Sequence, residues 1–138
     1  MPDPLAAMKD VYRLLKKQRT ALIRIPVADS YAWEKYRTHW MAMDPPRHFF
    51  LHTNKSMKIL AEKCGFEIAE VIYDSKDFQY AASEQLLRDI PLQAPNSYYL
   101  NRKLSVFKRS ELRKFARLAK ELNRTRRGDT ACFYLYKK

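Results

Sequence analysis

The segment from residue 40 to 52 is the part of the chain richest in groups that can do chemistry. Asp44 and His48 carry side chains that can take a proton from a hydroxyl or an amine, so both are candidate catalytic residues. Arg47 can hold an anion, and Trp40 leads a group of aromatic residues that suits the wall of a binding pocket. The alternative is that the aromatic residues are core and that Asp44 and Arg47 tie down a proline-rich turn. We expect the segment as a whole to line a ligand site.

Metal binding is not expected in this segment. His48 and His52 are four residues apart, which on a helix would place two metal ligands on one face. The residues between them follow two prolines and alternate poorly for a helix, and no third ligand lies nearby. The only cysteines, Cys64 and Cys132, have neither disulfide nor metal spacing. We expect both to be small buried apolar residues.

Ser30 and Tyr31 form a second candidate site. They follow a short β-branched strand that we expect over residues 20–27, ended by Pro26. Ligands gather beyond the carboxyl ends of strands in open α/β sheets, so both side chains are candidate binding residues. The alternative is that Ser30 caps a helix running to Trp40 and that Tyr31 is a packed ring.

A stripe of cations on the last predicted helix, residues 110–124, is the nucleic-acid signal in the sequence. Residues 101–138 hold 13 basic and 3 acidic side chains, whereas residues 1–100 hold 14 and 12. Such a face can follow phosphates. The alternative is an ordinary solvated helix face, interrupted by Glu111 and Glu121. The stripe consists of Arg109, Arg113, Arg117, Lys120 and Arg124.

Length and composition predict one cytoplasmic domain that covers residues 1–138. The chain has 46% hydrophobic residues, enough for a core, and a formal net charge of +12. No apolar run approaches the ~18 residues of a membrane span, and the first residues lack a signal-peptide pattern. Only Gly65 and Gly128 are glycines, so the chain has no glycine-rich nucleotide loop.

Periodicity predicts alternating helices and strands, hence a small mixed α/β sheet of about three strands with flanking helices. We expect the strand over residues 20–27 to be apolar on both faces and therefore buried. The expected helices cover residues 4–17, 30–40, 55–64, 83–89 and 110–123, and the expected strands cover residues 20–27, 66–73 and 130–136.

Several stretches, taken together in order and spacing, resemble a class I S-adenosylmethionine-dependent methyltransferase over nearly the whole chain. They are residues 2–16 with 21–26, Trp40 with residues 44–48, the helix 56–64 with Gly65-Phe66, residues 73–75 and 78–79, and residues 129–136. The resemblance implies a Rossmann-like fold whose fifth and sixth strands flank an antiparallel seventh. It also implies transfer of a methyl group from S-adenosylmethionine to a small-molecule acceptor. Residues 40–52 would then line the acceptor side, with Ser30 and Tyr31 as further contacts.

The chain departs from that family in two places. No counterpart of the family's cofactor-binding half precedes Met1, so we expect only the C-terminal half of the fold and no cofactor binding by this chain alone. Residues 17–19, Lys-Gln-Arg, stand where the family has Pro-Gly-Gly, and neither Gln18 nor Arg19 adopts positive φ as cheaply as glycine. Because an unpaired apolar strand edge favours association, we expect a homo-oligomer or a partner that supplies the missing half.

Overall fold

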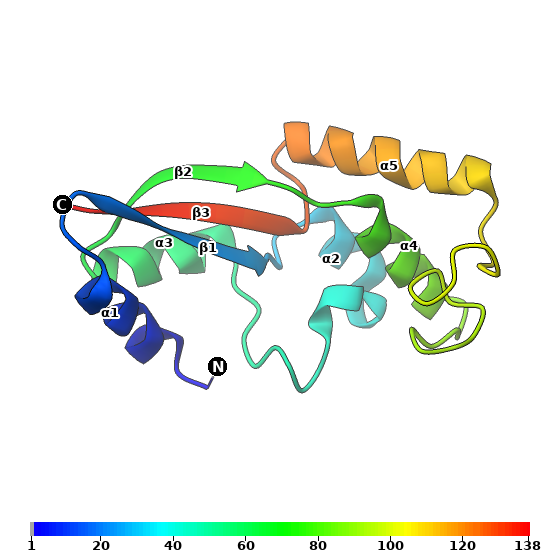
Figure 1. The fold of residues 1–138 in the computed structure, drawn as a ribbon, viewed down its shortest axis with the longest axis horizontal. Helices are drawn as coiled ribbons and strands as arrows, with labels where there is room; N and C mark the ends of the chain where they lie inside the picture. Colours follow the sequence, from blue (N-terminus) through cyan, green and yellow to red (C-terminus); the bar gives the residue numbers. More distant parts are fainter. Residues whose placement is uncertain (1) are drawn as a thin grey trace.

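The computed structural model describes residues 2–138 and shows a three-stranded sheet with two helices on one face and the others beyond one end (Figure 1). No helix in these residues is both long and apolar enough to cross a membrane. Two short 3₁₀ turns, Arg37–His39 and Met41–Met43, follow the second helix. The elements are α1 (Pro4–Leu14), β1 (Arg19–Pro26), α2 (Tyr31–Tyr36), α3 (Asn54–Lys63), β2 (Glu67–Tyr73), α4 (Asp77–Leu86), α5 (Arg109–Arg124) and β3 (Thr130–Lys137).

The strand order is β1–β3–β2, so the last strand in the chain lies in the middle of the sheet. β3 pairs antiparallel with both neighbours, and Phe133 stands opposite Ile23 on β1 and Val71 on β2. β1 and β2 consequently run in the same direction, and their carboxyl ends meet at one end of the sheet (Figure 1). The predicted fold class and the predicted central position of the seventh strand are both confirmed.

Helices α1 and α3 cover one face of the sheet and enclose the main core. Asp3 accepts a hydrogen bond from the backbone N–H of Ala6 and so caps α1, with Pro4 at the first helical position. Thr53 and Ser56 exchange the two hydrogen bonds of a capping box at the start of α3. The buried core residues are Met8, Val27, Met57, Ala61, Cys64, Phe66, Ala131, Phe133 and Leu135.

The opposite face of the sheet and the outer edge of β1 are not covered by residues 2–138. Leu22 of β1 is 54% exposed, and Ile72 of β2, on the other side of β3, is 41% exposed. The expectation that β1 is buried on both faces is therefore wrong within this chain. The physical reason is that β3 takes the central position, which leaves β1 as an edge strand with one open face.

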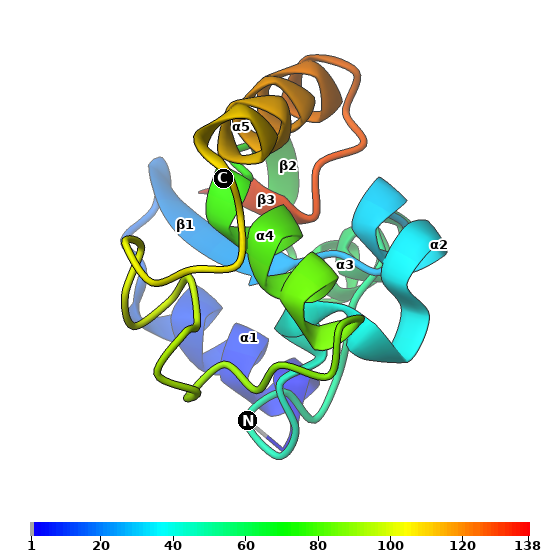
Figure 2. The same cartoon turned by 90° about the vertical axis from the view of Figure 1, so that its right-hand side faces the viewer.

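Helices α2, α4 and α5 lie beyond the carboxyl ends of β1 and β2, where they pack on one another (Figures 1 and 2). Three helices differ clearly from their predicted bounds, and the first of them, α1, ends at Leu14 rather than at residue 17. α2 ends at Tyr36 because Arg37 has a φ of 50°, and α4 covers Asp77–Leu86 rather than residues 83–89. Lys76 begins α4 through a bond from its backbone N–H to the Gln79 side chain.

The turn between α1 and β1 contains the departure from the family pattern. Gln18 has a φ of 56°, so it enters the left-handed region that glycine occupies most easily. Its backbone N–H donates to the carbonyl oxygen of Lys137 at 2.8 Å, which fastens the turn to the end of β3. The turn therefore forms without glycine, with Gln18 in the left-handed region.

Candidate functional site

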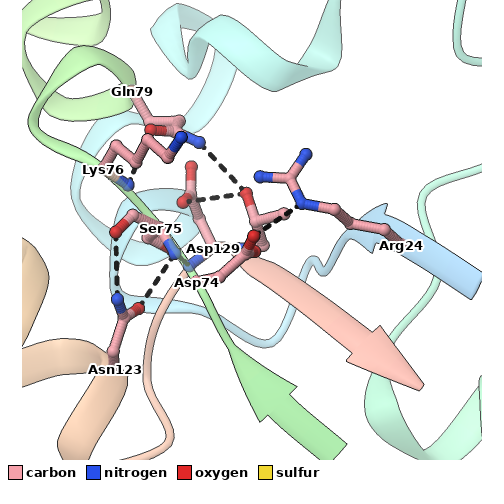
Figure 3. A network of polar contacts seen from close by, with 8 residues as sticks. Arg24, Asp74, Ser75, Lys76, Gln79, Asn123 and Asp129 are labelled. Carbon is pink, nitrogen blue, oxygen red and sulfur yellow. Dashed lines mark hydrogen bonds and ion pairs between the residues drawn. The ribbon is translucent and has the colours of Figure 1, made fainter. Parts of the chain in front are cut away.

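The end of the sheet where β1 and β2 finish and β3 begins carries a connected group of polar side chains (Figure 3). They come from β1, the end of β2, α4, α5 and the start of β3, and most of them are buried or half-buried. This is the end at which open α/β sheets bind their ligands. Hydrogen bonds within this group join the strand ends to the neighbouring loops and helices.

Asp129 and Trp40 form the most buried contact of this end. The Asp129 side chain has no exposed surface, and Trp40 is 1% exposed. The indole Nε1–H of Trp40 donates to Asp129 Oδ2 at 2.9 Å. Burial raises the pKa of the Asp129 carboxyl above its usual range, although hydrogen bonds to the carboxylate, including that of Trp40, act in the other direction. The contact fixes the segment that follows α2 against the start of β3.

Ser75 connects the end of β2 with the start of β3. Its Oγ accepts hydrogen bonds from the backbone N–H groups of Asp129 at 2.7 Å and of Thr130 at 3.1 Å. The side-chain amide of Asn123 then binds the Ser75 backbone twice: Oδ1 accepts from its N–H at 3.0 Å, and Nδ2 donates to its carbonyl oxygen at 2.9 Å (Figure 3). The last turn of α5 is thereby fixed to the sheet.

Two further contacts complete the group shown in Figure 3. Gln79 donates through Nε2 to the hydroxyl of Thr130 at 3.3 Å, and Arg24 donates through Nε to Asp74 Oδ2 at 2.7 Å. The Asp74 hydrogen bond, the largest contribution, raises the pKa of the Arg24 guanidinium. These groups bind mainly one another, so the cluster holds the strand ends rather than presenting a reactive group.

Ser30 and Tyr31 lie beside this cluster at the start of α2. Ser30 is fully buried, and its Oγ accepts from the backbone N–H of Trp33 at 3.3 Å, which makes it the cap of α2. Tyr31 is half-buried; its N–H donates to the carbonyl oxygen of Arg127, whose guanidinium lies 5.7 Å from the centre of the tyrosine ring. The structure thus gives both residues packing roles, and their roles in ligand binding stay predictions.

Asp44, Arg47 and His48 are brought together in the loop before α3. Asp44 has a φ of 35°, and its Oδ2 lies 3.1 Å from Nε of Arg47. His48 Nδ1 is 2.7 Å from the carbonyl oxygen of Ala42. Because a carbonyl oxygen only accepts, Nδ1 is the donor in this contact, and Nε2 is the nitrogen that is left to accept in the corresponding tautomer. Trp40, which the sequence groups with these three residues, is instead buried against Asp129.

An apolar cavity of about 210 Å³ lies between this loop, α1, α3 and β1. Arg47, His48 and His52 are its polar lining residues, and Asp44 is not part of the lining. Burial lowers the pKa of the His52 imidazole. Among residues 2–138, no group of three or more His, Cys, Asp or Glu side chains is placed to hold a metal ion. The apolar lining residues are Pro4, Ala7, Met8, Val11, Ile23, Ile25, Phe49, Phe50, Met57 and Leu60.

The sequence interpretation missed the role of Asp129, Ser75 and Asn123. Asp129 follows Gly128 and reads as a turn residue, and Asn123 sits among helix-forming residues. One signal was present: residues 73–75 end a predicted strand, and such positions gather polar groups. The partners of Ser75 lie 48 or more positions away, so no local pattern indicates them.

A family model for the methyltransferase domain matches residues 1–71, which is more than half of the 138 residues. The chain belongs to this methyltransferase domain family. The resemblance named from the sequence is therefore confirmed.

A search of solved structures finds a protein from Galdieria sulphuraria that is assigned as a sarcosine dimethylglycine methyltransferase. The likeness has a TM-score of 0.48 and 12% sequence identity, and it covers all of this chain and 49% of that one. The chain thus spans about half the length of that protein. Comparison with curated proteins gave no match.

Neither glycine of the chain forms an open cradle for S-adenosylmethionine, the cofactor that the family implies. An open glycine-rich turn lets backbone N–H groups approach such a ligand closely. Here a Cβ atom at Gly65 would lie 3.2 Å from the ring of Tyr12, and one at Gly128 would lie 2.5 Å from Asn123 Oδ1. Side chains of the protein itself occupy the space beside both glycines, so neither forms a cradle.

Proposed function

We propose that this chain supplies the acceptor side of an S-adenosylmethionine-dependent methyltransferase and is not active alone. The methyltransferase family match carries the reaction class. The filled space beside both glycines supports a cofactor site built from residues outside this chain. Transfer of a methyl group depends largely on how the acceptor is oriented, which is the task of a shaped pocket.

The cavity lined by Arg47 and His48 is the proposed acceptor site. Its apolar walls and small volume suit a compact apolar molecule, and Arg47 at its rim suits an anionic group on that molecule. His48 is the better candidate base, since its Nε2 is free to accept a proton while Asp44 is paired with Arg47. Asp44 positions Arg47 in this proposal.

The outer edge of β1 is the proposed site of association. Just after β1, the Val27 N–H donates to the carbonyl oxygen of Asp129, the residue before β3. By alternation along the antiparallel pair, Leu22 is among the residues of β1 that direct their backbone groups away from the sheet. An antiparallel pairing of two such edges would satisfy these backbone groups, and the ion pair of Arg24 with Asp74 at 2.7 Å reduces the positive charge on the strand. We therefore propose a homo-oligomer for the isolated chain.

Titration calorimetry with S-adenosylmethionine is expected to show no binding heat for the purified chain. Light scattering on the same sample would give the oligomeric state at that concentration. A stoichiometry of one cofactor per chain would contradict the proposal that the cofactor site lies outside it. One cofactor per dimer would show instead that association builds the site.

Benzoate, a compact apolar anion, is expected to bind the cavity in an NMR titration, with shifts confined to residues near Phe49–His52. Arg47→Gln is expected to weaken this binding about two- to fivefold, the size of an exposed charge contact. Arg13→Gln is the matched control, since Arg13 also pairs with an aspartate three positions earlier but does not line the cavity. Shifts spread over the surface, or equal effects of both variants, would contradict an acceptor site here.

A further inference from the structure

The outer face of α5 is an unusually regular array of cations. At about 100° per residue, Arg109, Arg113, Arg117, Lys120 and Arg124 fall within an arc of about 80° on a helix of 16 residues. All five are exposed. The array therefore forms a band of positive charge about 22 Å long on one side of the helix, which we name the α5 stripe.

The stripe is largely free of neutralising partners. Arg124 pairs with Glu121 at 2.6 Å, and the other acidic residue of the helix, Glu111, pairs with Arg88 from outside it. Within residues 2–138, the first four cations of the stripe form no ion pair with a carboxylate. More exposed cations adjoin its two ends, Lys103 and Lys108 before the helix and Arg126 after it.

The opposite side of α5 is occupied. Ala119 and Leu122 are buried, and α5 packs along α4 (Figure 2). An amphipathic helix that binds a membrane must offer its apolar face to the bilayer, and α5 cannot do so while that face is packed. A line of mainly arginine side chains, each able to bind a phosphate through two N–H groups, matches a phosphate backbone better.

We propose that the α5 stripe binds the phosphate backbone of nucleic acid without reading its sequence. This function goes beyond the proposed methyl transfer and does not depend on it. A 22 Å line spans about six base pairs of a duplex, at about 3.4 Å of rise per pair. Five phosphate contacts would release about four to five counterions on binding.

Fluorescence anisotropy with a labelled duplex of about 20 base pairs tests this proposal over a series of salt concentrations. The logarithm of the binding constant is expected to fall against the logarithm of salt with a slope of about −4 to −5. Arg113→Glu with Arg117→Glu is expected to weaken binding about tenfold or more and to reduce the slope by about two. The neutral double variant Arg113→Gln with Arg117→Gln is expected to weaken binding and reduce the slope by less. It tests the proposal even if the charge-reversed variant does not fold.

The matched control is Lys16→Glu with Lys17→Glu. These two exposed lysines lie at the end of α1, remote from α5, and their reversal lowers the formal charge from +12 to +8, as the α5 pair does. Duplex affinity is expected to change much less in this variant. An equal loss in both variants would show attraction to net charge only and would overturn a site on α5.

Binding to vesicles that contain phosphatidylserine tests the alternative that the α5 stripe contacts a lipid surface. Leu100 and Leu104 are exposed in the loop before α5 and are the apolar residues that a membrane would take up. Binding to vesicles but not to the duplex, with loss in Leu100→Ser and Leu104→Ser, would overturn the proposal in favour of a lipid surface.

Discussion

Replacing Trp40 with alanine is expected to lower the free energy of unfolding by about 3–5 kcal/mol, the usual cost of removing a buried aromatic ring. The ring is 1% exposed and packs in the core formed by α2, α4 and α5. Its loss also removes the Nε1–H donor from the buried Asp129 carboxylate. Since whole domains are stable by only about 5–15 kcal/mol, this variant is expected to be largely unfolded at mild urea concentrations followed by circular dichroism.

Trp40→Phe separates the ring from the hydrogen bond. Phenylalanine keeps most of the apolar volume but leaves Asp129 without its indole donor, so we expect a loss of about 1–3 kcal/mol. Combining it with Asp129→Asn should recover part of that loss, because no buried charge then remains unpaired. If Trp40→Phe unfolds at the same urea concentration as the original protein, the Trp40–Asp129 contact contributes nothing to stability.

The buried Asp129 carboxyl also makes the stability of the folded chain depend on pH. Burial raises the pKa of Asp129 in the folded chain above the ordinary value of 3.8. The protonated carboxyl is therefore favoured by folding, and the stability that it contributes is lost as pH rises from about 4 through the folded pKa. Asp129→Asn cannot titrate, so its free energy of unfolding relative to the original protein should increase over that pH range.

The sequence predicted the strand order but could not predict what fastens the strand ends. The family resemblance places the last strand between the other two, and the register of Phe133 with Ile23 and Val71 agrees. The Trp40–Asp129 bond joins positions 89 residues apart. Such a pairing arises only when α2 packs beneath the start of β3, and it leaves no trace in local spacing.

Helix ends were predicted less well than helix faces, because an end depends on a few individual contacts whereas a face follows a repeated pattern. The stripe face of α5 was predicted correctly because its periodicity continues over the whole helix. The start of α4 was missed by six residues, since Lys76 is a poor capping residue by type and the Gln79 side chain supplies the bond instead. Trp40 was predicted as a wall of the ligand site, whereas the structure buries it beside the polar cluster. Its proposed contact with the acceptor stays a prediction.

Gly128→Ala is expected to destabilise the chain by about 2 kcal/mol or more, because the new methyl group would enter the polar cluster. It would lie 2.5 Å from Asn123 Oδ1 and 2.8 Å from Ser75 Oγ. Neither atom can move freely: Asn123 Oδ1 accepts from Ser75 N–H, and Ser75 Oγ accepts from two backbone N–H groups at the start of β3. Displacing them leaves buried donors unpaired, at about 1–3 kcal/mol each.

A double-mutant cycle in urea unfolding distinguishes this cause from a general effect of losing glycine. Asn123→Ala removes the closest atom, so the double variant should lose less stability than the sum of the two single variants. Gly65→Ala is the comparison, because Gly65 has a φ of 85° and lies near Tyr12 rather than Asn123. Its cost should add to that of Asn123→Ala without coupling. If the losses of Gly128→Ala and Asn123→Ala are additive, the start of β3 adjusts around the new methyl group. The polar cluster would then not be a rigid support of the strand ends, contrary to the inference from its hydrogen bonds.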